Sequence, residues 1–176
     1  MTRTFGNTGI FLSNQSCIDT IAGQYFIVND FAIPRSITGY TEVVSHPLND
    51  TTFSYQFAIY DPIKKFLIRT LEGKIVLKAG TAQVGFLTQN ISGFTQLRKG
   101  ASYGLFCFAT SNQNLSTFAI RYGAFVSPVA LLLARSYLLG WPPDLTGSST
   151  AYETFSIYCN YDADTRPGFE CVSWTP

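Results

Sequence analysis

Apolar residues recur along most of the chain in short runs, either alternating with polar residues or continuous over a few positions. Runs of this length are typical of β-strands, because successive side chains point to opposite faces of a sheet. Segments between the runs contain Pro, Gly, Asn or Asp, which suit reversals of the backbone. The ten runs are QYFIVND, SITGYTEVV, FSYQFAIYD, KFLIRTL, KIVLKA, AQVGFLT, ASYGLFCFAT, STFAIRYG, PVALLLA and ETFSIYCNY.

No amphipathic stretch of helical length separates these runs, so we expect neighbouring strands to pair antiparallel rather than in β-α-β units. The sequence predicts an all-β fold, a single antiparallel two-sheet β-sandwich of jelly-roll type over residues 1–161. Residues 162–176 form a C-terminal extension. The length of 176 residues suits one domain, and the 15% of aromatic residues favours sheets over helices.

The run ETFSIYCNY is the expected closing strand of the sandwich. Alternation places Phe155, Ile157 and Cys159 on one face of this strand. A last strand often returns beside an early one, which would bring the two ends of the chain near each other. The predicted core contains Phe57, Ile59, Leu105, Cys107, Phe155 and Ile157.

Charge and hydropathy exclude two classes of partner. Charged residues make up 13% of the chain, its net charge is +1, and no cluster of Lys and Arg occurs, so we expect no nucleic acid partner. The longest apolar run, PVALLLA, is far shorter than the roughly 20 residues of a membrane span. We therefore expect no membrane insertion, and the polar start of the sequence does not resemble a signal peptide.

Residues with catalytic or metal-binding chemistry are few and scattered. Cys107 and Cys159 stand in apolar runs typical of buried free thiols, with a Cys159–Cys171 disulfide as the alternative. The lone His46 has no recognisable nucleophile near it in the sequence. Asp162 and Asp164 could offer oxygen ligands to calcium, but the pattern lacks further ligands, which favours a solvated turn. We assign no catalytic residue, metal ligand or cofactor.

The segment YLLGWPPDLTGSS, residues 137–149, is the best candidate for ligand binding. Trp141 and Tyr137 offer aromatic faces for a sugar ring, and Asp144 offers an acceptor for its hydroxyl groups. The alternative is that Trp141 closes the open end of the sandwich.

The extension contains Phe169, Val172 and Trp174, which is too aromatic for a typical disordered terminus and too short for its own core. We expect it to dock on a neighbouring subunit, with docking on its own sandwich as the alternative. Four N-x-S/T sequons lie in segments expected to be loops, where without a signal peptide we expect them to be unmodified. They begin at Asn14, Asn49, Asn90 and Asn114.

Several short patterns stand in a recognisable order: FGNT near the start, then FAIYDP, LRKGASYGLFCFA and finally FSIYCNY. Over about residues 5–161 the chain resembles a β-sandwich module of virion, tail and cell-surface proteins from phages, bacteria and archaea. The resemblance implies a binding or assembly domain without a catalytic motif. The chain departs from that group by its extension, DADTRPGFECVSWTP.

The leading functional hypothesis is a non-enzymatic structural protein of the virion surface, such as a capsid decoration, tail or fibre subunit. Its expected partners are copies of itself and other virion or surface proteins. The alternative is a carbohydrate-binding module of a secreted or cell-surface protein, with a glycan as partner. A hydrolase ranks third, because no pair among the 11 scattered carboxylates stands out.

Overall fold

The structure is a computed structural model that describes residues 2–124 and 130–163. These residues form fourteen β-strands and one short 3-10 helix, η1 (Tyr137–Leu139). The strands are β1 (Thr2–Gly6), β2 (Ser13–Ser16), β3 (Thr20–Ile27), β4 (Ala32–Val44), β5 (Thr51–Tyr60), β6 (Phe66–Arg69), β7 (Gly73–Leu77), β8 (Ala82–Asn90), β9 (Ser102–Ser111), β10 (Thr117–Ala124), β11 (Ala130–Ala134), β12 (Ser149–Ala151), β13 (Glu153–Phe155) and β14 (Ile157–Ala163).

The first sheet, called sheet A, is built around the long strand β4, which has antiparallel partners along both sides. Strand β8 pairs with one side over nine residues without a break in register. On the other side, β14 pairs with the first part of β4 and β10 with the last part. Strand β1 pairs with β14, while β2 and β13 pair with β10.

The second sheet, called sheet B, has the order β12-β11-β3-β9-β5-β6, and β7 also pairs with β5. Strands β6 and β7 bond successive parts of one side of β5, and β9 pairs along its other side. All strand pairs in both sheets are antiparallel, which confirms the predicted two-sheet antiparallel sandwich. Its jelly-roll connectivity stays a prediction.

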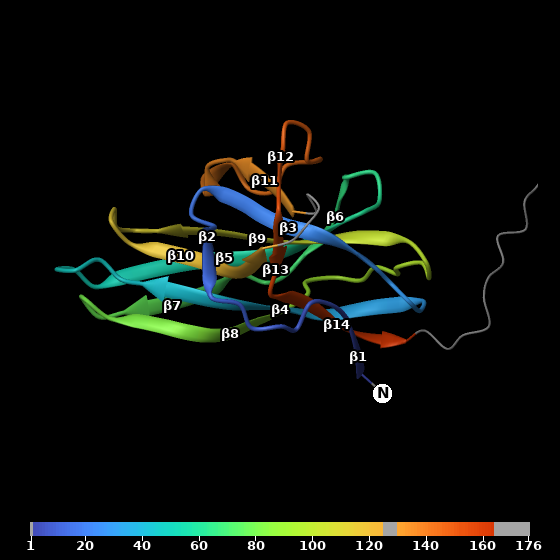
Figure 1. The fold of residues 1–176 in the computed structure, drawn as a ribbon, viewed down its shortest axis with the longest axis horizontal. Coiled ribbons are helices and arrows are strands. Elements are labelled where there is room, and N and C mark those ends of the chain that lie inside the picture. The colour runs from blue at the N-terminus through green and yellow to red at the C-terminus, as the bar shows by residue number, and fades with distance from the viewer. Residues whose placement is uncertain (1, 125–129, 164–176) are drawn as a thin grey trace, which may run out of the picture.

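The ends of the sandwich meet in sheet A. Strand β1 pairs with β14 from Thr2↔Asp162 to Gly6↔Tyr158, and Figure 1 shows the two strands side by side at the lower right. The predicted closing strand therefore does return beside an early strand. It is broken at Ser156, whose backbone N–H donates to Arg121 O and whose carbonyl accepts from Tyr40 N. At this residue the pairing partner changes, because β13 before it pairs with β10 and β14 after it pairs with β4.

The main core lies between the two sheets and is rich in aromatic residues. All six predicted core side chains are completely buried in it, from Phe57 on β5 to Ile157 on β14. Each buried large aliphatic or aromatic side chain contributes about 1.5–3 kcal/mol to folding. Alternation along the strands thus predicted the packing face correctly.

Three strands lie outside the runs predicted from the sequence: β1, β2 and β12. Their sequences TRTFG, SNQS and STA are short and mostly polar, so they form because longer neighbours offer backbone partners. Strand β14 continues to Ala163, two residues beyond the boundary predicted at residue 161. Phe169, Val172 and Trp174 of the extension lie outside the described residues.

Candidate functional site

The outer face of sheet B, which points away from the main core, carries a second apolar cluster. It arises because the middle of β5 and of β9 is apolar at successive positions, so both faces of these strands are apolar. The buried members are Ile21, Ala58, Tyr60, Phe106, Phe108, Leu131 and Leu145. The predicted ligand-binding segment covers this cluster.

Trp141 packs against the aromatic rings of this outer face rather than closing the open end of the sandwich. Its ring centroid lies 5.5 Å from that of Phe108 and 6.2 Å from that of Tyr60. The indole Nε1 donates to Gln56 Oε1 at 3.2 Å. The Tyr60 hydroxyl in turn donates to Pro142 O at 2.8 Å, so the segment is fastened to β5 at two points.

Tyr137 and Asp144 stand on either side of Trp141 in the same segment, and each has a partner of its own. The Tyr137 hydroxyl donates to Glu72 Oε1 at 3.1 Å, and burial, together with the Glu72 carboxylate, raises the pKa of Tyr137. Asp144 accepts from Thr146 N at 3.0 Å and from Lys65 Nζ at 2.9 Å. These hydrogen bonds, from Thr146 first and Lys65 second, lower the pKa of Asp144.

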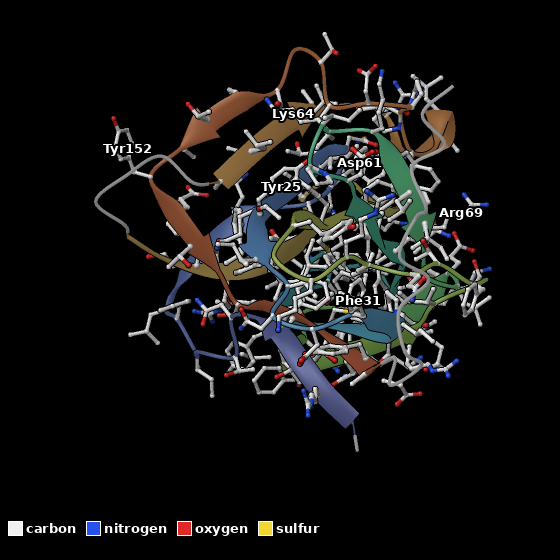
Figure 2. The ribbon with its side chains drawn as sticks, turned by 90° about the vertical axis from the view of Figure 1, so that its right-hand side faces the viewer. Tyr25, Phe31, Asp61, Lys64, Arg69 and Tyr152 are labelled. Carbon is white, nitrogen blue, oxygen red and sulfur yellow. The ribbon has the colours of Figure 1, made fainter. Side chains whose placement is uncertain are left out.

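Trp141 borders a hollow of about 550 Å³ whose other lining residues come mainly from β6. Arg69 and Ser92 provide polar groups there, and Phe66 adds a second aromatic ring. Figure 2 shows Arg69 at the outside of the molecule, pointing away from the sandwich. Of the three predicted sugar-binding residues, only Trp141 lines this hollow.

The described thiols and carboxylates are scattered over the fold and form no metal-binding cluster. No three of the described His, Cys, Asp and Glu residues lie close enough together to hold a metal ion. Cys17, Cys107 and Cys159 are free and buried, and burial raises the pKa of Cys107 and of Cys159. The thiols of Cys107 and Cys159 therefore stay protonated, as structural cysteines do. Cys171 lies outside the described residues.

Two expectations about loops need correction or completion. Asp162 is part of β14 and pairs with Arg35 at 2.7 Å, so it does not stand in a solvated turn, while Asp164 is not among the described residues. All four sequon asparagines are exposed. However, Asn14 lies in β2 and Asn90 is the last residue of β8, so these two are not in loops. Both corrections arise because strands run further than their apolar residues indicate.

An aromatic row that the sequence did not lead us to predict lies on the outer face of sheet A, formed by Tyr40, Phe86 and Tyr158. The Phe86 centroid lies 4.8 Å from that of Tyr40 and 6.2 Å from that of Tyr158. Phe86 is 45% exposed and its neighbour on the same face of β8, Val84, is 48% exposed. The available signal was the alternation in AQVGFLT, whose outward positions are all uncharged and, apart from Thr88, apolar.

Comparison with known proteins finds no protein-family model that matches the chain and no match among curated proteins. Within residues 2–124 and 130–163, no helix has the length and apolar character needed to span a membrane.

Proposed function

We propose that the chain is a non-enzymatic structural subunit that assembles with copies of itself, and that the assembly belongs to a virion surface. The observation that carries the proposal is the aromatic row Tyr40, Phe86 and Tyr158 on sheet A, in which the described residues leave Phe86 45% exposed and the two tyrosines partly exposed. Aromatic residues are enriched in the cores of protein interfaces. A row of this kind on an outer sheet face suits contact between subunits.

Other features of the described surface support the same proposal. Large apolar side chains are exposed in many loops and strands, among them Leu12, Leu48, Leu115 and Leu138. The chain carries few charges, and its net charge of +1 gives copies little mutual repulsion. The virion setting is supported by the ordered motifs FGNT, FAIYDP and FSIYCNY.

The extension is the second proposed contributor to assembly. Strand β14 ends at Ala163, which pairs with Ala32 at the start of β4, and 13 residues of the sequence follow it. Extended chain spans at most about 3.3–3.6 Å per residue, so a segment of this length can reach a neighbouring subunit. Phe169, Val172 and Trp174 would be its anchors.

Light scattering over a range of protein concentrations tests the proposal. The full chain should behave as an oligomer, and a chain that ends at Ala163 should form weaker contacts. A full chain that stays monomeric at every concentration would contradict the proposal, and unchanged assembly of the shortened chain would remove the extension from it.

The second candidate is glycan binding in the hollow beside Trp141, favoured by the meeting of Trp141, Arg69 and Ser92 at one surface. A sugar would stack on the exposed part of the indole and bond to the guanidinium. Titration with a panel of oligosaccharides tests it. Binding should fall with Arg69→Ala, which leaves the packing of Trp141 intact, and binding unchanged in both Arg69→Ala and Trp141→Ala would exclude this site.

A further inference from the structure

Strand β8 forms one margin of sheet A, and β4 is the one described strand with which it pairs (Figure 1, lower left). Tyr40 N donates to Ser156 O, away from β8, so the even-numbered residues of β4 bond the strands on that far side. Alternation then leaves the odd-numbered residues of β4 to bond β8. The backbone N–H and C=O groups of Ala82, Val84, Phe86 and Thr88 therefore point outward from the sheet.

Natural sheets protect such edges with charges, prolines, bulges or short strands. Strand β8 has none of these: its sequence AQVGFLTQN is nine residues long, uncharged and free of proline, and its register with β4 is unbroken. The other strands at the margins of the described sheets are protected. Charges occur in β1, β6, β7 and β13, and β2 and β12 are four and three residues long.

No feature of the described residues requires a glycine at position 85, in the middle of β8. A Cβ atom built on it meets nothing within 4 Å, and its backbone does not adopt a positive φ. Gly inside a strand weakens that strand by about 0.5–1 kcal/mol relative to Ala and often marks a place where another backbone approaches closely. The free edge beside it is such a place.

We infer that β8 pairs with β8 of a second copy, antiparallel across a two-fold axis that passes through Gly85. In this register Val84 lies opposite Phe86 of the second copy, and Ala82 lies opposite Thr88. All four residues with outward backbone groups are then hydrogen-bonded. An axis at Phe86 would instead require a hydrogen bond to Asn90 O, which already accepts from Leu71 N. The two copies of sheet A become one continuous sheet.

Side-chain chemistry supports a second copy as the partner. When two copies of β8 pair, each residue lies opposite a residue of the same strand in the other copy. Because β8 is uncharged, no like charges face each other there. The exposed Phe86 and Val84 form aromatic to β-branched pairs across the axis, a favourable cross-strand combination. The aromatic row on sheet A is extended by the matching row of the second copy.

This inference rests on the proposed assembly and names its contact surface. A cysteine at position 85 tests the register, because residues 85 of the two copies would form a non-hydrogen-bonded pair with Cα atoms about 4.5 Å apart, within disulfide range. The full chain with Cys171→Ser serves as the parent, since the three described native cysteines are buried. Gly85→Cys and Ala82→Cys are each added to it and oxidised with oxidised glutathione.

Most of the Gly85→Cys protein should become a covalent dimer, whereas Ala82→Cys should not, because residues 82 of the two copies lie far apart in this register. A mixture of Ala82→Cys and Thr88→Cys chains should cross-link. If Gly85→Cys fails to cross-link, or cross-links no better than Ala82→Cys, while light scattering still shows an oligomeric parent, the β8 contact is wrong and assembly uses another surface, such as the extension. A monomeric parent overturns both proposals.

A pair of lysine variants tests the same contact without cross-linking. Val84→Lys places a charge beside the axis in both copies and should weaken dimerisation about tenfold or more. Val76→Lys is the matched control, an exposed valine on the margin strand β7 of sheet B, and should leave dimerisation unchanged. Equal effects of the two substitutions would contradict a specific role of β8.

Discussion

The outer faces of the two sheets both carry aromatic residues, but these residues differ in how far the described chain buries them. On sheet B, Phe108 and Tyr60 are buried because the chain folds Tyr137 and Trp141 back over them. On sheet A, the described chain leaves Phe86 about half exposed. Aromatic residues that their own chain covers stabilise the subunit, whereas exposed aromatic residues are available for contact with another molecule.

The largest expected effect comes from uncovering sheet B. Trp141→Ala should lower the free energy of unfolding by about 3 kcal/mol, at the low end for Trp→Ala because the ring is partly exposed. Urea denaturation of the shortened chain that ends at Ala163 would measure this without a contribution from the extension. A loss below about 1 kcal/mol would mean that the segment covers the sheet without stabilising it.

A smaller effect is expected from one bond between the covering segment and β5. Tyr60→Phe removes the hydroxyl that donates to Pro142 O and should cost about 1 kcal/mol, the usual contribution of a buried hydrogen bond. Tyr158→Phe on sheet A is the matched control, since the structure gives that hydroxyl no hydrogen bond to a described residue. Equal losses in the two variants would remove the contrast between the faces.

On the outer face of sheet A, substitution should affect folding less than on sheet B. Phe86→Ser should change the unfolding free energy of the isolated subunit by less than about 1 kcal/mol, because half of the ring is already in water, while it weakens self-association. Unfolding measured at a concentration where the protein is monomeric checks the first part. A loss as large as that of Trp141→Ala would show that Phe86 belongs to the fold rather than to an interface.

The smallest effect concerns pH and the Asp144 carboxylate, which joins the covering segment to Lys65. Since the folded pKa of Asp144 lies below its ordinary value, its contribution to stability is present above about pH 4 and is lost as the pH falls from there. Asp144→Asn should therefore flatten the acid side of the curve of melting temperature against pH. An unchanged slope would mean that the exposed pair contributes nothing measurable.

Alternation of apolar residues was enough to predict the sandwich and its core, since Phe57 and Leu105 stand in strands long enough to show the pattern. It did not predict β1, β2 or β12, because their polar residues become strands only through their partners. The second cluster had a signal in the continuous apolar stretches FAIY and GLFCFA, which indicate burial of both faces of a strand. The pairing of Asp144 with Lys65 depends on the connection of distant loops, which no local pattern shows.

The position of β8 was also beyond sequence reasoning. Its residues read as an ordinary half-buried strand, and whether such a strand lies inside a sheet or at its margin depends on strand order. The same uncharged residues would be unremarkable between two neighbours. Only the one-sided pairing with β4 makes the absence of Lys, Glu or Pro informative.

The pairing of β1 with β14 has a consequence for the order in which the protein can be made. Residues Thr2–Gly6 leave the ribosome before the rest of the described chain, whereas their partner strand is among the last described segments to be synthesised. At translation rates of roughly 5–20 residues per second, the first strand waits on the order of ten seconds for its partner. Sheet A can therefore be completed only after synthesis of the sandwich ends, and the nascent chain must keep β1 soluble until then.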